Sequence, residues 1–126
     1  MAFGMGKSVL VIEDNADVRE LLCILLGAHG FAVKGAATGA EGVAAAFRTR
    51  PDLVIVDLSL PDDDGLSVAR TILSDAALAG VHVMAFSAYD TLQLRAEAVE
   101  AGCAGYAVKP FDPERLVENV RLLTGG

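Results

Sequence analysis

Apolar residues occur along the chain in short runs, which alternate with longer segments whose apolar positions recur at helical spacing. The short runs predict five strands, at residues 8–13, 31–36, 53–57, 81–87 and 105–109. The first, third and fourth runs are almost continuously apolar, which is typical of strands in a sheet that is covered on both faces. The second and fifth runs are less apolar, and we expect them toward the edges of the sheet.

The segments between and after these strands predict five helices, at residues 15–29, 40–48, 66–78, 90–101 and 113–123. Gly30 follows the first helix as a stop signal, and Thr38 with Glu41 forms a capping box before the second. Asp112-Pro113 supplies an N-cap and a first-turn proline to the last helix. A strand followed by a helix, five times over, predicts a single α/β domain: a doubly wound, five-stranded parallel sheet with helices on both faces.

The composition is that of a folded, acidic domain. Of the 126 residues, 53% are hydrophobic and 21% charged, which argues against a disordered chain. The net charge is −7 and the ten basic residues are scattered, so we expect no direct DNA binding, which requires clustered Lys and Arg. No apolar stretch approaches the roughly 20 residues that span a membrane, and the start lacks the apolar region of a signal peptide. We expect a cytoplasmic protein without membrane insertion, in which Cys23 and Cys103 are reduced and packed.

Polar side chains stand where the predicted strands end. Glu13 and Asp14 follow the first strand, and Asp57 closes the third. Ser87 closes the fourth strand, and Lys109 closes the fifth. Because parallel strands bring their carboxyl ends to one edge of the sheet, we expect these five side chains to converge there.

Three carboxylates in one pocket repel one another and raise one another's pKa unless a cation neutralises them. A hard divalent ion such as Mg²⁺ binds one or two carboxylates and completes its coordination with waters and phosphate oxygens. The pattern therefore predicts a metal site that receives a phosphoryl group. Asp57 is the natural nucleophile, because carboxylates form aspartyl-phosphates. Lys109 would pair with one phosphate oxygen, and Ser87 would donate to another.

Four segments, VIEDN, DLVIVDLSLPDDDG, VMAFSA and GYAVKPF, resemble in order and spacing the receiver domain of two-component response regulators. The resemblance covers essentially the whole chain. It implies a flavodoxin-like, CheY-like fold over residues 1–126, with a core at about 7–124. No output domain follows Leu123, so we expect either a receiver that acts alone or one domain of a longer protein. It also implies that Asp57 accepts a phosphoryl group from a histidine kinase or a histidine phosphotransfer protein.

The same resemblance implies a set of metal ligands. Asp14, Asp57 and the backbone carbonyl of Ser59 would bind Mg²⁺ directly, and Glu13 would act through a bound water. Mn²⁺ is the alternative ion. The side chains of Ser59 and Tyr89 would tune dephosphorylation.

A switch is implied as well. Ser87 and Tyr106 match the family's switch pair, in which the hydroxyl moves toward the phosphate and the aromatic ring turns inward. For Tyr106 a second interpretation stays open, because a tyrosine on an outer strand is often half-buried for its apolar ring alone. The Lys109-Pro110 bond matches one that is usually cis in the family. A downstream protein would read the switch on the face formed by the fourth helix, fifth strand and fifth helix.

The loop after Asp57 departs from the commonest family pattern. It reads Asp62-Asp63-Asp64-Gly65, which adds negative charge near the predicted site. Two interpretations stay open: Asp63 and Asp64 tune the affinity for the metal, or they belong to a solvated acidic loop.

Two other functions fit parts of the pattern. A haloacid-dehalogenase-type phosphatase also uses a strand-end aspartate, but such enzymes resemble one another in a second acid two residues on, where this chain has Ser59. A phosphate-independent binding module, or pseudo-receiver, is expected to lack at least one of Asp14, Asp57, Ser87 and Lys109, and all are present. We therefore favour a phosphorylatable switch, with at most weak self-phosphorylation from small donors and self-dephosphorylation, over an enzyme.

The first predicted helix carries an unbroken apolar run at residues 21–26. The positions that fit one buried face are Leu21, Leu22, Leu25 and Leu26. Cys23 and Ile24 then lie roughly opposite. Isolated exposed apolar residues are common, so this pair is either ordinary surface or part of a docking patch for a helical phosphodonor.

Overall fold

The computed structural model describes residues 6–126. Its strands are β1 (Ser8–Ile12), β2 (Ala32–Ala36), β3 (Leu53–Asp57), β4 (His82–Ser87) and β5 (Gly105–Val108). Its helices are α1 (Ala16–Ala28), α2 (Gly39–Thr49), α3 (Gly65–Ser74), the one-turn 3-10 helix η1 (Ala76–Leu78), α4 (Leu92–Ala101) and α5 (Pro113–Thr124). All five strands are parallel and lie in the order β2-β1-β3-β4-β5. The doubly wound α/β fold is confirmed, and β2 and β5 are the edge strands, as the weaker apolar runs predict.

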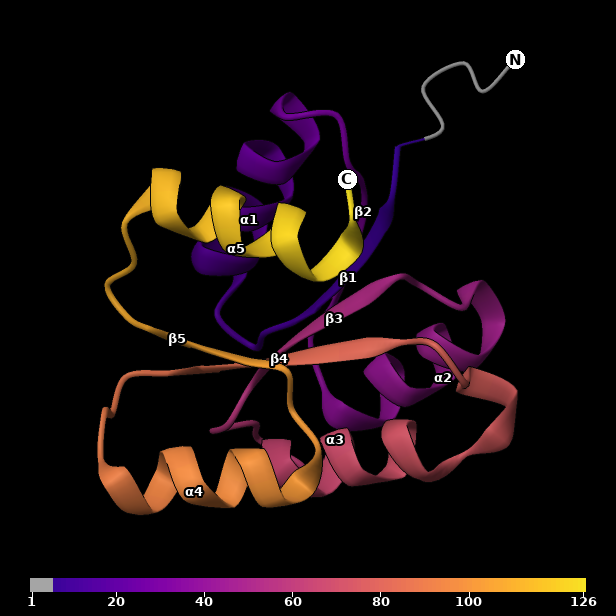
Figure 1. The fold of residues 1–126 in the computed structure, drawn as a ribbon, viewed down its shortest axis with the longest axis vertical. Coiled ribbons are helices and arrows are strands. Elements are labelled where there is room, and N and C mark those ends of the chain that lie inside the picture. The colour runs from indigo at the N-terminus through magenta and orange to yellow at the C-terminus, as the bar shows by residue number, and fades with distance from the viewer. Residues whose placement is uncertain (1–5) are drawn as a thin grey trace.

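Helices cover both faces of the sheet. Figure 1 shows α1 and α5 on one side of the strands and α2, α3 and α4 on the other. Successive side chains of a strand point to opposite faces, so the central strands contribute alternate residues to two core layers. Val11 packs with Leu22 of α1 and Leu116 of α5, whereas Ile12 packs with Ala46 of α2 on the opposite face. This double covering explains why β1, β3 and β4 are almost entirely buried.

The predicted helix at residues 66–78 is wrong as a single element. α3 ends at Ser74 and is followed by Asp75, whose backbone is extended (φ −92°, ψ 127°). The Asp75 carboxylate accepts a hydrogen bond of 2.9 Å from the Ala77 amide and opens η1. A short polar side chain that binds a nearby backbone amide competes with the helical ladder. Asp75 therefore interrupts a segment whose apolar pattern is continuous.

The expected caps are present at the other helices. The Thr38 hydroxyl accepts from the Glu41 amide at 3.1 Å, and the Asp112 carboxylate accepts from the Glu114 amide at 3.0 Å. α4 begins after Thr91, which caps it, so Asp90 lies outside the helix although the predicted range 90–101 included it. Asp90 instead forms an ion pair with Arg95.

Gly65 positions the end of β3. A Cβ atom at this position would lie 2.2 Å from the carbonyl oxygen of Asp57 and 2.6 Å from the Cα of Leu58. Only glycine lets the loop return this closely to the strand that it leaves. The loop after β3 is therefore folded directly over Asp57.

Cys23 and Cys103 are both free thiols and half-buried, as predicted. Burial raises the pKa of both, that of Cys103 to about 11, which disfavours the reactive thiolate. Within residues 6–126, none of the helices is both long enough and apolar enough to cross a membrane.

Candidate functional site

The structure brings the predicted polar side chains to the carboxyl edge of the sheet. Glu13 and Asp14 follow β1, and Asp57 is the last residue of β3. The carboxylates of these three residues each offer an oxygen within 4.8 Å of the others. Glu13 and Asp57 are 1% and 3% exposed, whereas Asp14 lies at the surface. The cluster is therefore two buried acids with a third at its mouth.

Lys109 supplies the positive charge of this cluster. Its Nζ lies 2.6 Å from Glu13 Oε1 and 3.2 Å from Asp57 Oδ2. The ammonium also lies 4.9 Å from the centroid of the Phe86 ring, within the range of a cation–π contact. One ammonium thus faces three carboxylates, which leaves the pocket with excess negative charge.

The protonation of the buried pair follows from this geometry. Burial is the main cause that raises the pKa of Glu13 to about 7, against the opposing effects of Lys109 and the Asn15 amide. Burial acts to lower the pKa of Lys109, but its close contact with the Glu13 carboxylate and the charge of Asp57 outweigh burial and raise it. Lys109 therefore stays charged, while Glu13 becomes easier to protonate.

The acids keep coordination capacity for a cation. Glu13 Oε2 accepts from the Asn15 amide at 3.0 Å, and Asp57 Oδ1 accepts from the Ser59 amide at 2.9 Å. Glu13 Oε1 contacts the Lys109 ammonium without a well-directed hydrogen bond, and among residues 6–126 it is the one buried side-chain polar atom in that condition. A buried, under-satisfied oxygen beside two further carboxylates suits a hard cation better than it suits a closed ion-pair network.

Sequence reasoning missed Arg19 of α1. Its guanidinium donates to the carbonyl of Glu13 at 2.8 Å and to that of Asp14 at 3.4 Å. The stem of Arg19 lies over Gly35 of β2, where a Cβ atom would come within 3.0 Å of it. Arg19 thereby holds the turn that carries both acids. Its position one turn into the helix after the acidic pair is the only sequence signal for this role.

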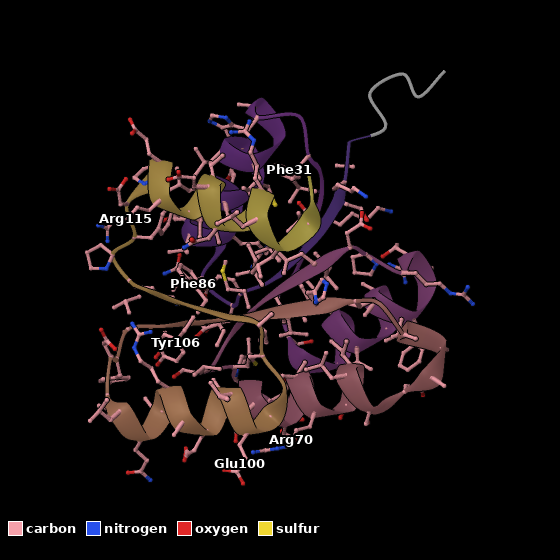
Figure 2. All side chains as sticks on the ribbon, in the orientation of Figure 1. Phe31, Arg70, Phe86, Glu100, Tyr106 and Arg115 are labelled. Carbon is pink, nitrogen blue, oxygen red and sulfur yellow. The ribbon has the colours of Figure 1, made fainter. Side chains whose placement is uncertain are left out.

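Ser87 and Tyr106 both form hydrogen bonds with the backbone of Tyr89. The buried Ser87 Oγ accepts from the Tyr89 amide at 3.0 Å, and the Tyr106 hydroxyl donates to the Tyr89 carbonyl at 2.6 Å. The Arg95 guanidinium lies 4.7 Å from the centroid of the Tyr106 ring. Figure 2 shows Tyr106 on the α4 side of the sheet and Phe86 on the α5 side. The Lys109-Pro110 peptide bond is cis, as the resemblance implies.

The exposed apolar residues of α1 agree with the prediction at Ile24 and contradict it at Leu21. Leu21, placed on the buried face, is 53% exposed, while Ile24 is 62% exposed and Cys23 is half-buried. Leu21 lines an almost wholly apolar pocket of about 450 Å³. The pocket is formed by Val18, Leu21, Leu25, Phe86, Lys109, Pro110, Phe111 and Pro113.

A comparison with protein families bears directly on this site. The sequence model of the response regulator receiver domain matches residues 9–121. The chain belongs to this family. Receiver domains are the phosphoacceptors of two-component systems; they interact with histidine kinases and bind Mg²⁺ at an acidic site. Among residues 6–126, Glu13, Asp14 and Asp57 form an acidic cluster that could hold a metal ion.

Individual relatives agree with the family match. The DNA-binding response regulator MtrA of Mycobacterium tuberculosis is 36% identical over 118 residues, which are 93% of this chain and 50% of MtrA. The transcriptional regulator RpaA of Synechocystis is 33% identical over 115 residues, 91% of this chain and 48% of RpaA. The chain thus spans about half the length of the curated relatives that it matches.

Solved receiver structures share the fold. The receiver domain of the sensor histidine kinase PA1611 from Pseudomonas aeruginosa is 29% identical, with a TM-score of 0.86 over 96% of this chain and 99% of that one. That structure contains a magnesium ion in its active-site cleft. The chemotaxis protein CheY4 of Vibrio cholerae superposes with a TM-score of 0.89 over 94% of this chain and 98% of that one, at 24% identity, a likeness of fold.

Proposed function

We propose that this receiver domain is a phosphorylatable switch in which Asp57 accepts a phosphoryl group from a histidine kinase or a histidine phosphotransfer protein. The observation that carries the proposal is the position of the Asp57 carboxylate at the end of β3. It faces the Lys109 ammonium at 3.2 Å and lies within 4.8 Å of two other carboxylates. The domain acts as a phosphoacceptor, with at most weak self-phosphorylation and self-dephosphorylation, rather than as an enzyme with turnover.

The transfer step needs little rearrangement of Asp57. The Ser59 amide fixes Oδ1 at 2.9 Å, so the carboxylate is already oriented toward the edge of the sheet. A carboxylate oxygen of Asp57 forms a bond to phosphorus as the phosphorus–nitrogen bond of the donor histidine breaks. The electron pair of that bond stays on the imidazole, which takes up a proton. Lys109 stabilises the charge that spreads over the phosphoryl oxygens, and the Ser87 hydroxyl donates to one of them.

The acidic cluster fits a divalent cation. Asp14, Asp57 and the carbonyl of Ser59 would hold Mg²⁺ directly, and Glu13 would act through a water, with Mn²⁺ as a substitute. When bound, the ion neutralises the carboxylates and the incoming phosphoryl oxygens. Without a cation, Asp14, Glu13 and Asp57 repel an anionic donor, and Lys109 alone offsets only part of that charge.

The switch follows from the contacts of Ser87. The Ser87 hydroxyl oxygen accepts a hydrogen bond of 3.0 Å from the Tyr89 amide. A phosphoryl group on Asp57 would draw this hydroxyl away from the amide. Tyr89 would then move with the loop, and Tyr106 would lose the carbonyl to which it donates. The ring of Tyr106 could turn inward and change the face made by α4, β5 and α5, where a downstream protein would bind.

The proposal is tested by intact mass after incubation with acetyl phosphate and Mg²⁺. The wild type should gain one phosphoryl group, and Asp57→Asn and a chelator-treated sample should gain none. Asp52→Asn is a matched control, because Asp52 lies at the opposite end of β3 and binds Ser8. If folded wild type takes no phosphate from acetyl phosphate or phosphohistidine donors and binds no beryllofluoride, the protein is a phosphate-independent binding module.

A further inference from the structure

Asp62 ties the loop after β3 to the start of α2. Its Oδ1 accepts from the Gly39 amide at 2.7 Å, and its Oδ2 accepts from the Ala40 amide at 3.0 Å. Both carboxylate oxygens are therefore used on one neighbouring element, 22 and 23 residues away in the sequence. The negative charge also lies at the positive end of the helix, where charge-assisted hydrogen bonds are strong.

Gly39, the first residue of α2, leaves room for the contact with Asp62 because it has no side chain. A Cβ atom on Gly39 would lie 3.3 Å from Asp62 Oδ1 and 2.9 Å from a methyl group of Val68. Glycine at this position lets the acidic loop, α2 and α3 meet closely. The tie is consequently a packed junction of three elements rather than a loose surface contact.

Asp62 anchors the middle of the loop that carries a proposed metal ligand, the Ser59 carbonyl. At the inner end of this loop the Ser59 amide donates to Asp57, and Ser59 pairs with Asp64 in an isolated bridge. Asp64 in turn caps α3 through the Leu66 amide at 3.0 Å. The chain from Ser59 to Asp64 is thus fixed at its two ends by the site and by α3, and at its middle by Asp62.

Asp63 differs from its neighbour in this respect. Its carboxylate accepts at 2.8 Å from the amide of the next residue, Asp64, and makes no other hydrogen bond among residues 6–126. Asp62 and Asp63 are both exposed and carry the same charge. The acidic loop therefore holds one anchoring aspartate and one locally bound aspartate side by side.

We propose that Asp62 is a positioning residue for the metal site: its bonds to α2 hold the loop so that the carbonyl of Ser59 stays oriented toward the cation. This inference rests on the proposed function, since it explains how the proposed metal site would reach its affinity for the cation. Outer partners that orient metal ligands commonly set the affinity, and their loss weakens binding about tenfold or more.

The test compares Asp62→Ala with Asp63→Ala. Binding of Mn²⁺ is followed by the paramagnetic resonance signal of the free ion, and Mg²⁺ by competition. Both variants lose one negative charge, so the difference between them isolates the bonds to α2. The Kd of Asp62→Ala should rise about tenfold above that of Asp63→Ala, the lower end of the range for such partners.

Ala40→Pro provides a reciprocal variant. It removes the amide that donates to Asp62 Oδ2 while every charge is kept, and proline is tolerated in the first turn of a helix. It should raise the Kd in the same direction, and its effect should not add to that of Asp62→Ala. Thermal unfolding of each variant, without metal, reports the loss of helix capping separately.

Three results would overturn the proposal, each in a different way. Equal weakening by Asp62→Ala and Asp63→Ala would mean that charge alone acts. A lower Tm of Asp62→Ala with an unchanged Kd would mean that Asp62 only caps α2. Absence of Mn²⁺ binding by the wild type would reject the proposed metal site itself, which the titration of the unmodified protein shows before any variant is compared.

Discussion

Ser87 and Tyr106 bind the same residue from its two backbone sides: the Ser87 oxygen accepts from the Tyr89 amide at 3.0 Å, and the Tyr106 hydroxyl donates to the Tyr89 carbonyl at 2.6 Å. The buried end of β4 is thereby connected to the aromatic side chain of β5 through a single exposed residue. A displacement of either partner changes the position of the residue that the other one holds. The hydrogen bonds of Tyr89 thus connect the carboxyl end of β4 to Tyr106 on β5.

This link predicts the effect of Ser87→Ala. The variant loses the acceptor for Tyr89 and the donor to the phosphoryl group, so acetyl phosphate should label it more slowly, and the Tyr106 ring should no longer respond to beryllofluoride. The ring signals of Tyr106 in nuclear magnetic resonance measure the response. Ser74→Ala, at an exposed position of α3, is the control. A normal Tyr106 response in Ser87→Ala would reject the link.

Metal should stabilise the fold through the acidic cluster. A ligand that binds only the native state at 100 times its Kd adds about 3 kcal/mol to the free energy of unfolding. Mg²⁺ should therefore raise the Tm of the wild type and leave that of Asp57→Asn nearly unchanged. Calorimetry with and without a chelator measures both. Equal stabilisation of the two proteins would place the bound ion elsewhere.

The raised pKa of Glu13 predicts a pH dependence of stability in the absence of metal. Its ordinary pKa is 4.5 and its value in the fold is about 7, so the folded state binds the proton more tightly than the unfolded chain. Between these two values the folded state holds more protons, and the free energy of unfolding falls as the pH rises. We expect a loss of about 1–3 kcal/mol from pH 5 to pH 8. Urea unfolding in the presence of a chelator measures it.

Glu13→Gln supplies the comparison for that titration. The amide cannot ionise but keeps a similar shape, so its free energy of unfolding should fall less over the same pH range. Parallel curves for wild type and Glu13→Gln would show that another group is responsible.

The apolar pocket beside Lys109 predicts where a phosphodonor docks. Leu21 is 53% exposed and lines this pocket, whereas Ile24 is 62% exposed on the same helix outside it. Leu21→Glu should slow phosphotransfer from a histidine phosphodonor by about tenfold, the loss expected from roughly 1.4 kcal/mol of docking energy. Labelling by acetyl phosphate should not change, since it needs no docking.

Ile24→Glu is the matched control, with the same charge introduced into the same helix. It should leave both reactions near the wild-type rate. Equal slowing by the two variants would extend the docking surface to the face with Cys23 and Ile24. Equal loss of labelling by both donors in Leu21→Glu would instead indicate damage to the site.

The fold could be predicted from the sequence because its central and edge strands differ in how continuously apolar they are. The continuously apolar runs predict the buried strands β1, β3 and β4, and the mixed runs predict the edges β2 and β5. The break after Ser74 was not predictable from periodicity, since it depends on the hydrogen bond from the Ala77 amide to Asp75. Likewise, the exposure of Leu21 depends on how α1 is rotated against the sheet, which a helical repeat alone does not determine.

The residues of the candidate site could be predicted from the sequence, whereas the residues that hold them in place could not. Parallel topology by itself brings Glu13, Asp57 and Lys109 to one edge, so their types and order were sufficient. The roles of Arg19 and Asp62 depend on contacts between elements. Their side chains bind backbone groups that carry no signal in the sequence, and only the packing of α1, α2 and the two loops shows them.

The edge strand β5 places side chains on both faces of the sheet. Tyr106 packs toward α4, and three residues later Lys109 lies over Phe86 on the opposite side of the sheet. A protein that binds α4 and β5 and prefers the inward form of Tyr106 would therefore favour the phosphorylated state of Asp57. By thermodynamic reciprocity, it would favour that state by the same factor by which phosphorylation strengthens its own binding. The amount of downstream target would then help to set the fraction of the domain that is phosphorylated at equilibrium.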